Sequence, residues 1–236
     1  NLMTDQLKNQ QDKLIINERH EAWGNLARKL AHEIKNPLTP IQLTIDRIKN
    51  KYLKQLSNND QKNFNENLKI ITNQIKQIEN LVNEFSDFAR MPKPILKDND
   101  LILILKENIK LLSEMDKSIE IEIINSTDKL LFNCDKEQIA RVFFNLIKNS
   151  IESIHQKFEK DPNFIKKISI EILQNNDHIK FILMDNGIGF SQIKGKIKEI
   201  LNPYFTTKKN GTGLGLSIVN KIINDHNGEI KFYSLS

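Results

Sequence analysis

A histidine, an acid and an amide lie close together in the first part of the chain, as His32, Glu33 and Asn36. Apolar residues recur around them at helical spacing: Leu26, Leu30, Ile34, Leu38, Ile41, Ile45 and Ile48. At about 100° per residue, His32 lies roughly 160° from the middle of this row, and Asn36 shares its face. An imidazole that points away from the core, with a carboxylate to orient or deprotonate it, suits nucleophilic chemistry. The alternative is an ordinary surface histidine.

Two amides, Asn145 and Asn149, are four residues apart and therefore lie on one face of a predicted helix. Their oxygens are hard ligands of the kind that suits Mg²⁺, which binds few protein groups and keeps phosphate oxygens and water around it. The alternative is a polar stripe on an amphipathic helix. The spacing makes this pair a candidate metal site, with the roles of Lys148 and Glu152 on or near the same face left open.

The run Asp185-Asn-Gly187-Ile-Gly189 follows a predicted apolar strand. Its glycines let the backbone approach a flat ligand, and Asp185 can accept a hydrogen bond from an exocyclic amine. The same pattern is also common in simple turns. By itself it is a weak indication of a site.

A second glycine-rich run, Gly211-Thr-Gly213-Leu-Gly215, leads into an apolar-periodic helix. Free backbone N–H groups and the helix dipole at such a position can bind an anion. No Gly-Lys-Ser/Thr follows, so this is not the Walker phosphate loop. It does not follow a strand in a βαβ unit, which argues against a dinucleotide-binding fold.

The elements that carry the histidine are two long predicted helices. The first runs from about residue 5 to about residue 53, and Pro37 and Pro40 inside it predict a bend just after His32. The second carries apolar residues at intervals of three and four between residues 64 and 88. One hairpin would leave much of each apolar stripe exposed, whereas two would bury them as a four-helix bundle. The sequence therefore favours a homodimer.

After a linker at residues 91–94, the pattern predicts a mixed α and β domain. Asp100 and Asp135 can each cap a helix, the first reaching about Met115. Strands are expected at residues 119–124, 130–133, 168–173, 178–184 and 229–233, and a helix from Gly213 or Gly215 to about residue 226. The chain stops soon afterwards, so we expect a further strand to be missing.

Composition limits the possible functions. The net charge is +5, but the basic residues are scattered, so we expect no nucleic acid as a partner. A single cysteine excludes a disulfide within the chain. No apolar run approaches the ~20 residues of a membrane helix, and no signal peptide is visible. Any membrane attachment is therefore expected only through a segment missing from this chain.

These motifs together resemble those of the sensor histidine kinases of two-component systems. Residues 32–37 resemble the phospho-acceptor box, and residues 38–43 with Ala22-Trp23 look like the NtrY-like branch. Residues 145–149, 185–189 and 211–217 resemble the asparagine box and the two glycine boxes. Residues 202–208 resemble the phenylalanine box, a mobile lid over ATP. Five boxes in family order are much more specific than any one of them.

The resemblance implies three segments. Residues 1–20 would be a helical signalling linker that resembles the end of a HAMP module. Residues 21–91 would be a dimerisation and histidine-phosphotransfer hairpin forming a dimeric four-helix bundle. Residues 92–236 would be an ATP-binding α/β two-layer sandwich of the GHKL or Bergerat type, truncated at its C-terminus. The chain would be the cytoplasmic part of a protein anchored in the bacterial inner membrane.

The activity implied is autophosphorylation of His32 by Mg²⁺·ATP, followed by phosphoryl transfer to an aspartate of a response regulator receiver domain. Glu33 would hydrogen-bond the imidazole or act as base, and Asn36 would support phosphatase activity toward the partner. Asn145 and Asn149 would hold Mg²⁺, and Asp185 would read adenine. The remaining nucleotide contacts would come from Gly187, Gly189, Phe205, Thr206, Thr207, Lys208, Gly211, Gly213, Leu214 and Gly215. The alternatives are a non-catalytic dimeric signalling scaffold, or a serine kinase or ATPase built on the same nucleotide fold.

Overall fold

The structure is a computed structural model that describes residues 2–124, 127–175, 178–190, 197–208 and 211–233. The chain divides into two compact units, residues 1–92 and residues 93–236. No helix among the described residues combines the length and the apolar character needed to cross a membrane.

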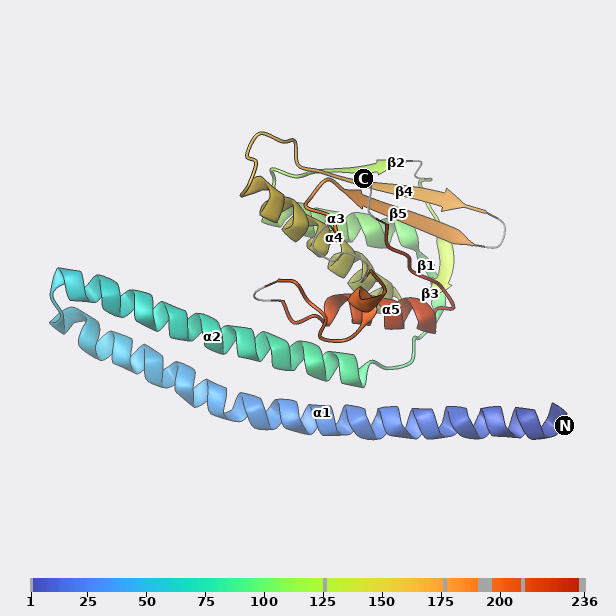
Figure 1. The fold of residues 1–236 in the computed structure, drawn as a ribbon, viewed down its shortest axis with the longest axis horizontal. Helices are drawn as coiled ribbons and strands as arrows, with labels where there is room; N and C mark the ends of the chain where they lie inside the picture. Colours follow the sequence, from blue (N-terminus) through green and yellow to red (C-terminus); the bar gives the residue numbers. More distant parts are fainter. Residues whose placement is uncertain (1, 125–126, 176–177, 191–196, 209–210, 234–236) are drawn as a thin grey trace. The chain divides into compact units, whose positions relative to one another are not determined.

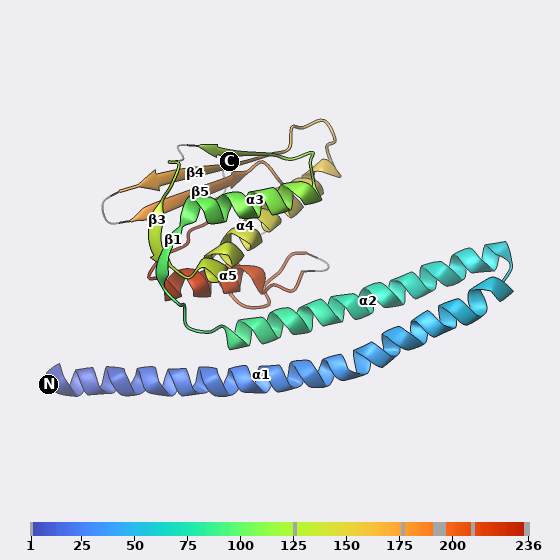
Figure 2. The same ribbon diagram turned by 180° about the vertical axis from the view of Figure 1, so that it is seen from behind.

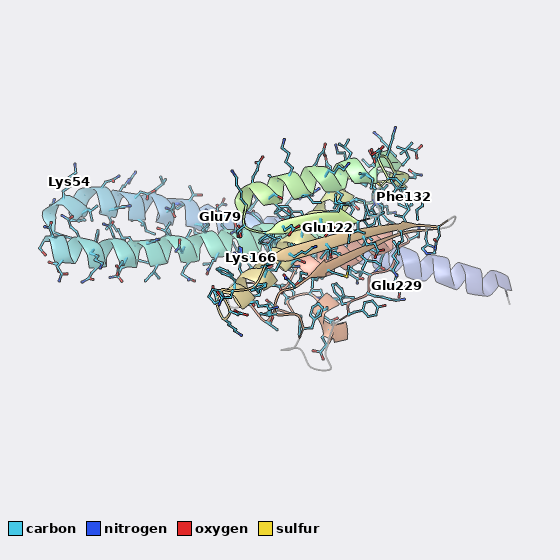
Figure 3. The ribbon with its side chains drawn as sticks, turned by 90° about the horizontal axis from the view of Figure 1, so that it is seen from above. Lys54, Glu79, Glu122, Phe132, Lys166 and Glu229 are labelled. Atoms are coloured by element: carbon cyan, nitrogen blue, oxygen red, sulfur yellow. The ribbon has the colours of Figure 1, made fainter. Side chains whose placement is uncertain are left out.

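The first unit is the expected helical hairpin. Helix α1 (Leu2–Tyr52) leads through a short 3-10 helix, η1 (Leu53–Gln55), into helix α2 (Asn58–Arg90), which returns along α1 (Figure 1). Ser57 caps α2, because its hydroxyl accepts a hydrogen bond from the N–H of Asp60 at 3.3 Å. Charged side chains project from the outside of the hairpin, for example Lys54 at the turn and Glu79 on α2 (Figure 3).

Helix α1 continues through both of its prolines, and Figure 1 shows that it bends part-way along its length. Proline lacks the N–H that would bond to the preceding turn, so a bend is the expected consequence of Pro37 and Pro40. Beyond them, the hydroxyl of Thr44 donates to the carbonyl oxygen of Pro40 at 2.7 Å.

The apolar row of α1 is only partly buried within one chain, as expected for a single hairpin. Leu38 and Ile45 pack with Leu68 and Ile75 of α2 in the core of the hairpin. Four other members of the row are exposed: Leu26, Leu30, Ile34 and Ile41. The buried flank also includes two small residues that the apolar row did not contain, Ala27 and Ala31. The stripe is therefore wider than one neighbouring helix can cover.

The second unit is an α/β two-layer sandwich, as the sequence predicted. Its elements in chain order are β1 (Lys97–Asp100), α3 (Leu101–Met115), β2 (Glu120–Ile124), β3 (Leu131–Cys134), α4 (Lys136–Phe158), β4 (Lys167–Gln174), β5 (Ile179–Asp185), η3 (Ile197–Leu201) and α5 (Gly215–Asp225). Strands β1 and β3 form an antiparallel pair. The main sheet has the order β2-β4-β5, parallel between β2 and β4 and antiparallel between β4 and β5.

The helices lie on one face of the main sheet, as both side views show (Figures 1 and 2). Helix α4 packs against β4 and β5, with α3 and α5 on either side of it. Along β4, Ile168, Ile170 and Ile172 are buried between sheet and helices. Side chains on the other face of the sheet are more polar, for example Glu122 of β2 (Figure 3). One apolar face per sheet gives one core, which is the reason for two layers.

Two predicted caps set the start of the helices in this unit. The Asp100 carboxylate accepts from the N–H of Ile102 at 3.0 Å, and the Asp135 carboxylate accepts from the N–H of Gln138 at 3.0 Å. His226, at the end of α5, accepts a hydrogen bond at Nε2 from the N–H of Asp135 at 3.0 Å, and its Nδ1 lies 2.8 Å from the carbonyl oxygen of Ile222. This imidazole links the end of α5 to the start of α4.

One expected strand is absent and one observed strand was not foreseen. Residues 97–100 form β1, for which the sequence pattern gave no prediction and which exists through its pairing with β3. Residues 229–233 were expected to form a strand, but the structure gives them no strand pairing. Alternating apolar residues make a strand only where a partner edge is in register, and sequence pattern alone does not supply that partner.

Candidate active site

His32, Glu33 and Asn36 are all exposed on α1. The buried residue Ala31 precedes them, and Leu38 follows two residues after Asn36. The sequence therefore placed the candidate acceptor correctly on the solvent-facing side of its helix. An exposed imidazole on a rigid helix can be approached by a separate catalytic domain or by a protein partner.

Asn145 and Asn149 lie on α4, half-buried, one turn apart. The side-chain N–H of Asn145 donates to the carbonyl oxygen of Arg141 at 2.8 Å, which fixes the amide on its own helix. The amide oxygen of Asn145 faces Gly215 at the start of α5, where a Cβ atom would lie only 3.2 Å from it. Gly215 thus allows the first turn of α5 to come close to the amide of α4.

Asp185 ends β5 and is held by two serines of α4 that the sequence reading did not single out. The hydroxyl of Ser150 donates to one carboxylate oxygen at 3.0 Å. The hydroxyl of Ser153 and the N–H of Gly187 meet the other oxygen at 3.3 Å and 3.0 Å. Ser150 is 3% exposed, so its hydroxyl depends on this bond. The carboxylate is therefore fixed in orientation by hydrogen-bond donors.

The glycines after Asp185 serve the packing of the loop against α4. A Cβ at Gly187 would lie 2.6 Å from the backbone carbon of Ser153. Gly189 has φ +61°, which is the left-handed region that favours glycine. At Gly187 the close neighbour is therefore the protein itself, which gives this glycine a role that the argument from ligand approach did not foresee.

The phenylalanine box and the second glycine box contact each other closely through their backbones. The N–H of Tyr204 donates to the carbonyl oxygen of Gly213 at 3.0 Å. Gly213 has φ +70°, and a Cβ there would lie 2.5 Å from the carbonyl carbon of Tyr204. Tyr204 itself has φ +67°, an uncommon conformation for a bulky residue. Phe205 is half-buried, whereas Thr206 and Thr207 are exposed.

Helix α5 begins at Gly215 without a side-chain cap, and its N-cap residue is Leu214. The side chain of Leu214 is fully buried, so only its backbone could take part in binding a ligand. The uncapped N–H groups of the first turn and the helix dipole favour an anion at this point.

Lys208 reaches from the loop to α4. Its ammonium nitrogen lies 3.1 Å from the amide oxygen of Asn149 and also contacts the carboxylate of Glu152. Its backbone is held as well, because its N–H donates to the hydroxyl of Thr206 at 3.1 Å and its carbonyl oxygen accepts from the N–H of Gly211 at 3.2 Å.

Helix α4 therefore connects all the predicted nucleotide motifs. Asp185 is bound by Ser150 and Ser153, Gly187 packs on Ser153, Lys208 binds Asn149 and Glu152, and Gly215 faces Asn145. The two residues that the sequence pattern did not single out are Ser150, directly after Asn149, and Ser153, one turn beyond it. Their polar character along the helix was the available signal, but only the packing of the loops shows what they bind.

Two known protein families match this chain, one in each of its two units. Residues 22–94 match the family model of the His Kinase A (phospho-acceptor) domain. Residues 134–236 match the family described as histidine kinase-, DNA gyrase B-, and HSP90-like ATPase.

Curated relatives are similar to this chain over nearly its whole length. An NtrY-like sensor histidine kinase of Rickettsia prowazekii is 38% identical over 230 residues, which are 97% of this chain and 36% of that protein. The nitrogen regulation protein NtrY of Azorhizobium caulinodans is 33% identical over 219 residues, which are 93% of this chain and 28% of that protein. The chain thus spans about a third of the length of these curated relatives.

Solved structures give the same picture. Histidine kinase ThkA, solved in complex with the response regulator protein TrrA, is 25% identical, with a TM-score of 0.60 over 94% of this chain and 61% of that one. Full-length ShkA in complex with AMPPNP shares the fold, with a TM-score of 0.62 at 18% identity over 86% of this chain and 41% of that one. With a phospho-acceptor domain followed by a histidine kinase-type ATPase domain, the chain belongs to the sensor histidine kinases, and its relatives include the NtrY-like members of that family.

Proposed function

We propose that this chain transfers the γ-phosphoryl group of ATP to His32 and then passes it to an aspartate of a response regulator receiver domain. The observation that carries the nucleotide half of the proposal is the convergence of Asp185, Lys208 and Gly215 on the same stretch of α4, between Asn145 and Ser153. The other half rests on His32 being exposed within a matched phospho-acceptor module.

The acceptor nitrogen of His32 must be neutral to attack phosphorus. Glu33, the next residue, either hydrogen-bonds the other ring nitrogen or accepts a proton as base. Bond formation to the imidazole breaks the bond between the γ-phosphorus and the bridging oxygen, and ADP leaves. Most of the acceleration then comes from in-line positioning and from charge neutralisation around the phosphates.

ATP would be held by the face of α4 and the loops on it. Asp185, fixed by Ser150, would accept a hydrogen bond from the adenine amino group. The backbone of the loop from Gly211 to Gly215 and the start of α5 would meet the phosphates. Phe205, Thr206 and Thr207 would cover the nucleotide, and Lys208 would add positive charge at the phosphates. Gly187 and Gly189 would shape the adenine side.

Asn145 and Asn149 fit a role in holding Mg²⁺. Asn149 already accepts from one cation, the Lys208 ammonium, which indicates that its oxygen is available to positive charge. Among the described residues, no group of three or more His, Cys, Asp and Glu side chains is placed to hold a metal ion. A bound Mg²⁺ would therefore rely on the amide oxygens together with phosphate oxygens and water, and would neutralise charge on the phosphates.

A response regulator is the expected protein partner. ThkA, which is similar over nearly the whole of this chain, was solved in complex with the response regulator protein TrrA. An exposed His32 suits transfer to such a partner. Asn36, one turn further along the same face, would orient a water for hydrolysis of the partner's phosphoaspartate.

We also propose that the chain acts as a homodimer through the hairpin. The exposed edge of the apolar stripe runs through Leu30, Ile34 and Ile41 on α1, and Ile71 and Ile78 on α2. At about 100° per residue, His32 lies roughly 160° from this edge. A second hairpin could therefore cover the edge and leave His32 accessible, giving a four-helix bundle.

Two adjacent isoleucines of α2 provide a matched test of the dimer. Ile71 is 46% exposed on the apolar edge, whereas Ile70 is 58% exposed about 100° further round the helix. Sedimentation of the parent should give twice the chain mass. We expect Ile71→Asp to shift it toward the monomer and Ile70→Asp to leave the dimer intact. A monomeric parent at micromolar concentration would contradict the bundle.

The proposed division of the chain follows the matched modules. Residues 1–20 would act as a helical signalling linker, residues 21–91 as the dimerisation and phosphotransfer hairpin, and residues 92–236 as the catalytic domain. We propose that the chain is the cytoplasmic part of a protein that is anchored in the bacterial inner membrane by a segment outside this sequence. Neither nucleic acid nor a direct membrane contact is part of the proposal.

Incubation with γ-labelled ATP and Mg²⁺ separates this function from the two alternatives. Label on the protein that is lost in acid but stable in base indicates phosphohistidine, which is the expected result. Acid-stable label would indicate a serine kinase. Released phosphate without labelled protein would indicate an ATPase. If neither labelled protein nor released phosphate is found, the result would indicate the non-catalytic dimeric scaffold.

A further inference from the structure

The cluster around Lys208 joins residues from a loop and from α4. The ammonium of Lys208 lies 3.1 Å from the amide oxygen of Asn149 and contacts a carboxylate oxygen of Glu152. The other carboxylate oxygen of Glu152 is 4.0 Å from the ammonium of Lys148, one turn back on the same helix. The side chains of Lys208 and Glu152 are only about a third exposed. This is a partly enclosed site in which two oxygens of α4 bind one cation.

The same oxygen of Asn149 is the proposed ligand of Mg²⁺. An ammonium and a divalent cation that bind this one oxygen together would lie within a few Å of each other and repel strongly. A lysine ammonium is a compact point charge on a flexible stem, so it can leave such a position without moving the backbone. The backbone of Lys208 is fixed to Thr206 and Gly211, which makes a movement of the side chain alone the simplest change.

We propose that the ammonium of Lys208 and the metal ion bind alternately at Asn149, and that Glu152 is the positioning residue that holds Lys208 there in the nucleotide-free protein. This rests on the proposed function, because it takes Asn149 as a metal ligand. When the metal arrives with the nucleotide, the phosphates offer Lys208 a new negative partner close by. Lys208 then leaves Asn149, the metal takes its place, and Glu152 remains paired with Lys148.

Glu152 and Lys208 would together control the access of the metal to Asn149, which differs from a simple effect of the lysine's charge. A loose positive charge near the site would weaken metal binding only through its field, whereas an ammonium in contact with Asn149 also occupies the ligand. Lys148 provides the matched control, because it pairs at a longer distance with the Glu152 carboxylate oxygen that Lys208 does not contact. Removing either lysine deletes one positive charge near the same carboxylate.

The test measures Mn²⁺ binding to the whole, nucleotide-free protein by the loss of the free-ion electron paramagnetic resonance signal. Mn²⁺ prefers the same oxygen ligands as Mg²⁺. We expect Lys208→Met to bind one Mn²⁺ roughly tenfold or more tightly than the parent, because it frees the oxygen of Asn149 and removes a positive charge in contact with it. Lys148→Met should stay within about threefold of the parent. Adding Asn149→Ala to Lys208→Met should remove the gain, because the ligand that Lys208 had occupied is then absent.

Lys208→Gln serves as a second variant if the methionine variant does not fold, as judged by circular dichroism. Equal Mn²⁺ affinity in the parent and both Lys208 variants would overturn the proposal. So would an equal gain in Lys148→Met, since that would reduce the effect to the general field of the two lysines. The measurement involves neither ATP nor His32, so its failure would leave the phosphotransfer activity standing. Absence of labelled His32 would likewise leave the exchange at Asn149 to be decided by Mn²⁺.

Discussion

The two units of the chain display their functional residues in opposite ways. In the hairpin, His32, Glu33 and Asn36 stand exposed on a single helix, and one periodic pattern decides where they point. In the second unit, Asp185 comes from the end of β5 and Lys208 from the loop before α5, and both are bound to α4 by hydrogen bonds. The hairpin thus presents an accessible candidate acceptor, whereas the second unit builds its candidate site from distant parts of the sequence.

The two units should therefore respond differently to substitution. An exposed residue on a rigid helix can be changed with little effect on folding, so its loss reports on chemistry alone. A residue in the α4 cluster also positions its neighbours, so its loss should affect ligand affinity and local order together.

Replacement of the acceptor should have the largest effect. We expect His32→Gln to reduce acid-labile labelling to background while the affinity for an ATP analogue stays normal, because His32 belongs to the other unit. Labelling with γ-labelled ATP and calorimetry measure the two quantities. His178→Gln is the matched control, since His178 is also exposed but lies at the turn between β4 and β5. Persistent acid-labile label in His32→Gln would move the acceptor to another histidine.

The two neighbours of His32 should separate the two directions of phosphate transfer. Glu33→Gln is expected to slow autophosphorylation about a hundredfold, the usual size of a lost general base or its orienting group. Asn36→Ala should leave autophosphorylation near normal and slow dephosphorylation of the partner. Both rates are measured in both variants with a phosphorylated response regulator. Unchanged dephosphorylation in Asn36→Ala would reduce Asn36 to a residue that simply precedes Pro37.

In the second unit, Asp185→Asn should weaken binding of an ATP analogue by about ten- to a hundredfold. Ser150, Ser153 and Gly187 all donate to this carboxylate, and an amide nitrogen in its place would leave one donor facing another. Calorimetry measures the affinity, with Asp225→Asn, a surface pair of Lys221, as the control. Equal affinity in parent and Asp185→Asn would remove Asp185 from the adenine site.

The smallest effect is expected away from both sites, at Asp116. The hydroxyl of Ser118, then the imidazole of His155 at 2.5 Å, hold the pKa of the Asp116 carboxyl well below its ordinary value. A lowered pKa in the folded state stabilises the protein above the unfolded pKa, about 4, and this contribution is lost as the pH falls through the folded value.

We therefore expect Asp116→Asn to lower the free energy of unfolding by about 1 kcal/mol near neutral pH. The difference from the parent should shrink as the pH falls below about 4. Urea unfolding across this pH range measures it, with the exposed Asp128→Asn as the control. A difference that grows in acid would show that the sign of the linkage is wrong.

Local pattern was sufficient for much of the fold. The helices α1 and α2, the caps Asp100 and Asp135 and the strands β4 and β5 all follow from short-range spacing, because helix and strand periodicity depends on neighbours along the chain. The position of His32 on its helix follows for the same reason. Strand β1 and the failed strand at residues 229–233 did not follow, because strand pairing depends on an edge that local pattern does not reveal.

The sequence motifs identified the segments of the proposed nucleotide site. How these segments contact one another depends on tertiary packing, which the motifs do not contain. Ser150 became a partner of Asp185, and Glu152 a partner of Lys208, because β5 and the loop before α5 both pack on α4. Gly187 is required by the backbone of Ser153, a contact between residues 34 positions apart. Residues on one helix share a face by geometry alone, but contacts between loops and helices arise from packing, which depends on the whole chain at once.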